Sequence, residues 1–208
     1  QHLEDALPGF LESRKLIKAN NDSPGVLHFV GDKFVFYRFA NRYRMALQFR
    51  GVTLEGFGKE TEQGYSALTR IFLVWSVFER YTEMAGVHPP YKPFFLHVPK
   101  SELGALARVI DRNDPERRLF DFLRRQVRDE IHKKSLDRFR GGDDWAVVYY
   151  ASALRHIYVH GHLTAAAQGC TGAQVGMICN EVSRSLLHWI GKDFARRLKI
   201  AKGAPGRR

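Results

Sequence analysis

The stretch from Leu68 to Tyr81 reads LTRIFLVWSVFERY, and it decides the fold class. Its large apolar residues recur at steps of three or four positions, apart from one adjacent pair, as they do on one face of an α-helix. These residues are Leu68, Ile71, Phe72, Trp75, Phe78 and Tyr81. A broad apolar stripe of this kind is normally buried against other elements. We therefore expect a long, core-facing helix within residues 59–85.

A similar pattern precedes this helix in residues 32–50. Asp32 is a suitable N-cap, and five apolar residues share a face: Phe36, Phe39, Ala40, Tyr43 and Leu47. The start of the segment has an alternative. Val26–Val30 and Phe34–Tyr37 are rich in strand-forming residues and flank Gly31, which suits a hairpin turn. We favour a helix.

The middle of the chain opens with a connector, because Val87–Pro99 holds four prolines, which end helices. Ser101 then suits the cap of a short helix. A further helix is expected from Pro115, a favourable first-turn residue, to about Arg138. Gly141 and its neighbouring glycine end this helix.

The last part predicts two more helices. Asp143 or Asp144 caps one that contains Arg155, and the final helix runs from about Ala173 to Leu198. Its apolar face comprises Val175, Ile178, Val182, Leu186, Trp189 and Ile190. The basic tail, residues 199–208, is expected to be flexible. No strong strand pattern appears elsewhere, so the sequence predicts an all-α antiparallel helical bundle.

Length and charge limit the protein class. A chain of 208 residues suits a single domain, with residues 1–90 as N-terminal extension helices. The net charge of +11 attracts polyanions, of which phosphate backbones are the commonest. No apolar run approaches the roughly 20 residues that span a bilayer, and the first residues do not resemble a signal peptide. We expect no membrane contact and a cytoplasmic location.

The segment Leu154–His162 reads LRHIYVHGH and carries the candidate chemistry. Arg155 is followed directly by His156 and, after four intervening residues, by His160. This spacing resembles the arginine–histidine motif of the HEPN superfamily, which is an Arg, a polar residue and then a His after about four to six intervening positions. The likeness covers about ten residues in detail and extends loosely over the second half of the chain.

The resemblance implies an HEPN-type bundle that cuts RNA without a metal, by attack of the 2′-hydroxyl on the adjacent phosphodiester. His160 would be the general acid or base, since imidazole gains and loses protons near neutral pH. Arg155 would hold the phosphate, and His156 would orient the pair. The family also implies a homodimer with a composite site, a toxin or defence role, and an inhibitory antitoxin protein as partner.

Two alternatives stay open at this site. A non-catalytic HEPN module would bind RNA or a protein, and in a purely structural role Arg155 would pair with a carboxylate while His160 ends a helix. Positions five apart on a regular helix also point about 140° apart. Glu79 in the long helix is the candidate to orient Arg155, or else an exposed charge with another basic partner.

Other residues extend the candidate RNA surface. Four basic residues close to the C-terminus are the clearest phosphate contacts: Arg196, Arg197, Lys199 and Lys202. Tyr158 can stack on a base, although such tyrosines are more often buried in a core. His156 and His160 have a spacing that can bind zinc, but the accompanying metal-ligand pattern is missing. We expect no metal and no cofactor.

Overall fold

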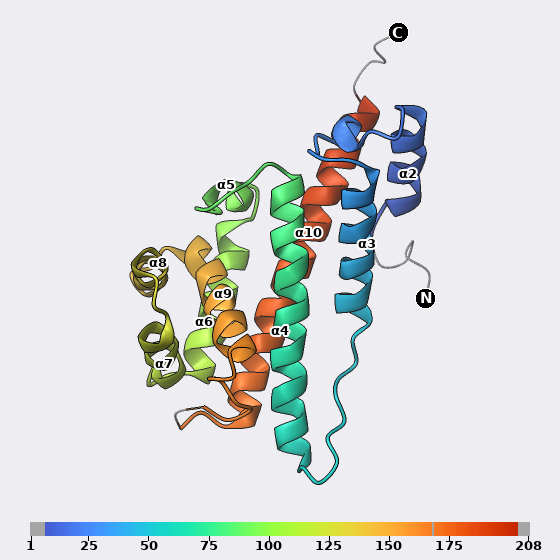
Figure 1. The fold of residues 1–208 in the computed structure, drawn as a ribbon. Coiled ribbons are helices and arrows are strands. Elements are labelled where there is room, and N and C mark those ends of the chain that lie inside the picture. The colour runs from blue at the N-terminus through green and yellow to red at the C-terminus, as the bar shows by residue number, and fades with distance from the viewer. Residues whose placement is uncertain (1–6, 168, 204–208) are drawn as a thin grey trace.

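Two long helices form the centre of the protein. The structure is a computed structural model that describes residues 7–167 and 169–203. Helix α4 (Lys59–Met84) and helix α10 (Gly172–Gly203) lie side by side and begin at the same end of the molecule (Figure 1). At that end a Cβ added at Gly64 would lie 2.7 Å from the Cβ of Ala165, so only glycine permits this approach. The predicted helix within residues 59–85 is confirmed.

Helix α3 (Lys33–Gln48) covers one side of α4, with α2 (Phe10–Ala19) and the 3₁₀ turn η1 (Pro24–Leu27) beside it (Figure 1). The carboxylate of Asp32 accepts a 2.9 Å hydrogen bond from the backbone N–H of Val35. The helix prediction for residues 32–50 is thus confirmed, and the hairpin alternative is wrong. Leu47 was expected in the core but is 41% exposed, because it lies in the last turn of α3.

The other side of α4 is covered by shorter helices: α5 (Lys92–Phe95), α6 (Lys100–Asn113), α7 (Arg118–Gln126), α8 (Glu130–Arg140), η2 (Asp144–Ala146) and α9 (Val147–Val159). The single helix expected from Pro115 to Arg138 is wrong. Asp114 accepts the backbone N–H groups of Leu119 and Phe120 and so starts α7 late. A break then follows at Val127, and Asp129 caps α8 through the N–H of His132 at 2.7 Å.

The ends of two other helices differ less from the predicted ones. Helix α6 begins one residue before Ser101, directly after Pro99, so Ser101 is not its cap. Helix α10 continues to Gly203, so residues 199–203 are helical rather than flexible; residues 204–208 lie outside the described part. In the described ranges 72% of the structure is helical and no strand occurs, which confirms the all-α class. Within these ranges no helix is long and apolar enough to cross a membrane.

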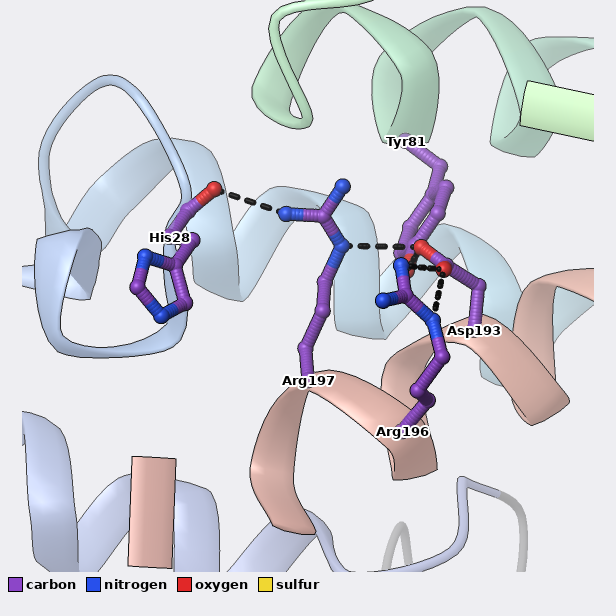
Figure 2. Close-up of polar contacts among 5 residues, drawn as sticks. All are labelled: His28, Tyr81, Asp193, Arg196 and Arg197. Carbon is purple, nitrogen blue, oxygen red and sulfur yellow. Dashed lines mark hydrogen bonds and ion pairs between the residues drawn. The ribbon is translucent and has the colours of Figure 1, made fainter. Parts of the chain in front are cut away.

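A buried carboxylate joins the two central helices (Figure 2). Asp193 on α10 is 8% exposed and accepts a 2.6 Å hydrogen bond from the hydroxyl of Tyr81 on α4. Arg197 donates to the same carboxylate from Nε at 2.8 Å and to the carbonyl of His28 from Nη1 at 2.8 Å. Arg196 donates to it from Nε at 3.0 Å. The network therefore ties α4, α10 and the turn after η1 together.

Removing this carboxylate tests its role. Asp193→Ala leaves the Tyr81 hydroxyl and the Arg197 guanidinium without their buried partner, so we expect a loss of about 3 kcal/mol in the free energy of unfolding. Arg196→Ala is the matched control, because that side chain is 39% exposed and exposed pairs contribute about 1 kcal/mol or less. Urea denaturation measures both. Equal losses in the two variants would contradict a stabilising role for the buried part of the network.

Candidate functional site

The candidate site lies where α9 ends. His160 is the C-cap residue of α9, and the left-handed Gly161 that follows (φ 74°) turns the chain away. The N–H of His160 donates to the carbonyl of His156 at 3.2 Å, and the N–H of His162 donates to that of Ile157 at 3.0 Å. This closure satisfies carbonyls that the helix end leaves without partners. It also leaves His160 and His162 exposed.

The two histidines of the motif lie against each other. The ring centroids of His156 and His160 are 4.5 Å apart with an interplanar angle of 63°. Both side chains border an open hollow of about 380 Å³ whose lining residues are Gln126, Arg128, His156, Ile157, His160 and His162. Gln126 is the last residue of α7 and Arg128 lies in the connection from α7 to α8, so the hollow is built by two segments of the chain.

The pKa of His156 is lowered from its usual value of 6.5. His156 is exposed to solvent, but desolvation by the protein atoms on one side of its ring is the largest cause, since it disfavours the charged imidazolium. The nearby His160, Arg155 and His132 add to the shift in that order. His132 is fixed in place because its Nε2 lies 2.9 Å from the carbonyl oxygen of Tyr149. At neutral pH, His156 is therefore predominantly neutral and suited to accept a proton.

Arg155 takes a different direction from the histidines. Its guanidinium carbon lies over the ring of Phe72 on α4, 6.0 Å from the centroid. Its Nε is buried and has no hydrogen-bond partner among the described residues. Arg155 is not among the residues that line the hollow, so its link to the histidines is through its charge on His156. The structure brings His156 and His160 together but leaves Arg155 beside them, on the face towards α4.

Two further candidate residues are Glu79, which was predicted to orient Arg155, and Tyr158, which was predicted to stack on a base. Glu79 is exposed on α4 and forms no ion pair with Arg155 in the part of the chain that the structure describes. The hydroxyl of Tyr158 shares a 3.0 Å hydrogen bond with Thr69 on α4 and is partly buried. Tyr158 thus helps to seat α9 on α4.

The basic residues near the C-terminus divide into two groups. Arg196 and Arg197 are engaged by Asp193 (Figure 2), and Arg197 also lies over the ring of Phe29. Lys202 pairs with Glu12 of α2. Lys199 is exposed on the last turns of α10. Of the four, Lys199 is thus the most accessible to a phosphate.

Sequence reasoning missed the other side of the hollow. Arg128 is exposed and lies in a stretch that was predicted to continue as a helix with alternating charges. The helix ends after Gln126, and the break at Val127 leaves Arg128 beside the end of α9. The signal was present in Asp129, which is a good N-cap residue.

The fold and the hollow define an all-α protein with a paired-histidine site. In comparisons with known proteins, no family model, no curated protein and no solved structure matches this chain. Among the described residues, no group of three or more His, Cys, Asp or Glu side chains is placed to hold a metal ion. Cys170 and Cys179 are buried free thiols, as two isolated cysteines predict.

The coupling of charges at this site can be measured directly. We expect an NMR titration to give His156 a pKa below 6.5. His160→Ala and Arg155→Ala should each raise that value, because each removes a nearby positive charge. Burial persists in both variants, so the pKa should stay below 6.5. Arg38→Ala is the control and should leave it unchanged, because Arg38 is exposed on α3, on the opposite side of α4 from α9. No change in the first two variants would show that the charges do not reach His156.

Proposed function

We propose that this chain is a metal-independent endoribonuclease that works through His156 and His160. The observation that carries the proposal is the contact between two imidazoles at the mouth of a hollow that also holds a guanidinium, that of Arg128. Two imidazoles supply the acid and the base that phosphodiester cleavage requires. The resemblance of Arg155–His160 to the HEPN motif gives the same reaction class, and the net charge of +11 favours a polyanionic substrate.

The reaction divides between the two rings. The neutral imidazole of His156 accepts the proton of the ribose 2′-hydroxyl while the 2′-oxygen forms a bond to phosphorus. The bond from phosphorus to the 5′-oxygen breaks, and His160 gives that oxygen its proton. The products are a 2′,3′-cyclic phosphate and a 5′-hydroxyl. A guanidinium donates hydrogen bonds to the phosphate and stabilises the charge that builds up in the transition state.

Two arginines share the electrostatic role. Arg128 lines the hollow with the histidines and contacts the phosphate directly. Arg155 lies over Phe72 and, within one chain, contributes positive potential. A homodimer, which the family resemblance implies, would bring a second Arg155–His160 pair to the site. The partner is then a second copy of this chain, in addition to RNA.

Cleavage of a mixed RNA pool in EDTA tests the proposal. We expect wild-type protein to give 2′,3′-cyclic phosphate ends, and His156→Ala and His160→Ala each to lower the rate about 10²–10⁴-fold, the usual contribution of general acid–base catalysis. Arg128→Ala should lower kcat as well as kcat/KM, because it removes a guanidinium that stabilises the charge of the transition state. His162→Ala is a matched control, because this imidazole borders the hollow outside the ring pair. RNA that stays intact in the presence of the wild-type protein would contradict the proposed ribonuclease activity.

The pH dependence gives an independent check. The base must be neutral to accept a proton, and the pKa of His156 is lowered from 6.5. The acid limb of the kcat/KM profile should therefore lie below pH 6.5, and Arg155→Ala should move it upwards. Single-turnover cleavage of a short oligoribonucleotide across pH 4.5–8.5 measures both; an acid limb above 6.5 would assign the base to another group.

One observation favours a second candidate, a non-catalytic HEPN module that binds RNA or a protein. Arg155 is turned towards Phe72 and its Nε is buried, which suits a packing role. Tight, salt-sensitive RNA binding without products would support it.

The ribonuclease could act as a toxin or defence effector that an antitoxin protein restrains. Expression of the chain should then be toxic, and His160→Ala should relieve the toxicity.

A further inference from the structure

A second group of positive charges lies on the other side of α4 from the histidine hollow. Arg70 on α4 donates from Nη1 to the side-chain oxygen of Asn180 on α10 at 2.6 Å and from Nη2 to the carbonyl of Phe49 at 3.1 Å. Phe49 directly follows α3, and Figure 1 shows α3 and α9 on opposite sides of α4. Arg70 thus fastens the end of α3 to both central helices.

Each of the two residues that accept hydrogen bonds from Arg70 has a further arginine close to it in the chain. Arg50 is the next residue after Phe49, and Arg184 lies one helical turn beyond Asn180 on α10, on the same face of that helix. The loop that carries Arg50 is held a second time, because the N–H of Val52 donates to Ser66 of α4 at 2.9 Å. The loop after α3, helix α4 and helix α10 therefore each bring one arginine to the same part of the surface.

The ion pairs among the described residues neutralise this cluster only in part. Arg184 pairs with Glu181, but both acceptors of Arg70 are uncharged, and Arg50 forms no ion pair with any described residue. Three positive charges thus face one carboxylate. The pKa of Arg70 is lowered, first by burial and then by the charges of Arg184 and Arg50. Like charges held close together destabilise a fold unless a counter-charge is supplied.

We propose that Arg50, Arg70 and Arg184 form a binding site for a phosphate group. Arg70 is pre-oriented by its two hydrogen bonds, which lowers the cost of ordering it for a ligand. Arg50 and Arg184 are exposed and offer the planar, multiple N–H donors that suit phosphate oxygens. The phosphate comes either from a polynucleotide backbone or from a small phosphorylated molecule. The site is separate from the histidine hollow and does not require cleavage.

Thermal unfolding in low-salt buffer with sodium pyrophosphate is the first experiment. A ligand that binds only the folded state raises Tm, so we expect a rise for the wild type and less than half of it for the double variant Arg50→Gln, Arg184→Gln. Arg70 is left intact because its loss would free the loop after α3. Arg38→Gln, an exposed arginine of α3, is the control and should respond like the wild type. Arg50→Gln alone should also raise Tm slightly without anion, since it removes repulsion.

A second arm identifies the source of the phosphate. A 2′-O-methyl oligonucleotide lacks the attacking hydroxyl, so its binding is read by fluorescence anisotropy whether or not the protein cuts RNA. An affinity about tenfold lower in the double variant, with a shallower salt dependence, assigns the site to a nucleic-acid backbone. Loss of the pyrophosphate response alone assigns it to a small phosphorylated ligand. An undiminished pyrophosphate response in the double variant, or an equal loss in Arg38→Gln, overturns the proposal.

Discussion

The parallel packing of α4 on α10 depends on one carboxylate held almost out of water. Burial alone would favour its protonated form, yet the pKa of Asp193 is lowered, because Tyr81, Arg197 and Arg196 all donate to it. A carboxylate with a lowered pKa stabilises the fold above the pKa of the unfolded chain and loses this contribution as the pH falls through the folded value. The network therefore sets the register of the two helices at neutral pH. Helices α3, α6 and α9 pack on this pair, and α7 and α8 pack on α9.

The helices with strong apolar periodicity were predictable from sequence, because tertiary packing and local pattern agree there. The long helix around Trp75 and the helix capped by Asp32 are examples. The break at Val127 was not predictable from periodicity, since the residues on both sides fit one helical pattern. There a buried apolar side chain and the cap by Asp129 outweigh helix continuity. Similarly, the basic composition of residues 199–208 indicated a flexible tail, whereas Leu198 packs in the core and the helix continues to Gly203.

In the candidate site, too, the features set by local sequence were predictable and those set by tertiary packing were not. That His156 and His160 lie on one helical face follows from a separation of four residues, and five positions predict that Arg155 points elsewhere. Both are local properties, and both hold in the structure. The roles of these three residues remain predictions. The place of Arg128 depends on how the α7–α8 connection packs against the end of α9, and no pattern within either segment specifies that contact.

The position of the histidines at a helix end sets two effects against each other. The C-terminal end of a helix carries partial negative charge and stabilises an imidazolium. Burial and the surrounding positive charges act in the opposite direction and lower the pKa of His156. An anion bound in the hollow would offset the largest of these charge effects, the repulsion of His156 by His160, because both imidazoles line the hollow. Phosphate binding and proton uptake are then linked: a bound phosphate raises the affinity of the imidazole pair for a proton, and the proton in turn strengthens the binding of phosphate. For a catalyst this linkage supplies the protonated ring that the leaving oxygen needs, and for a non-catalytic module it makes polyanion binding tighter as the pH falls.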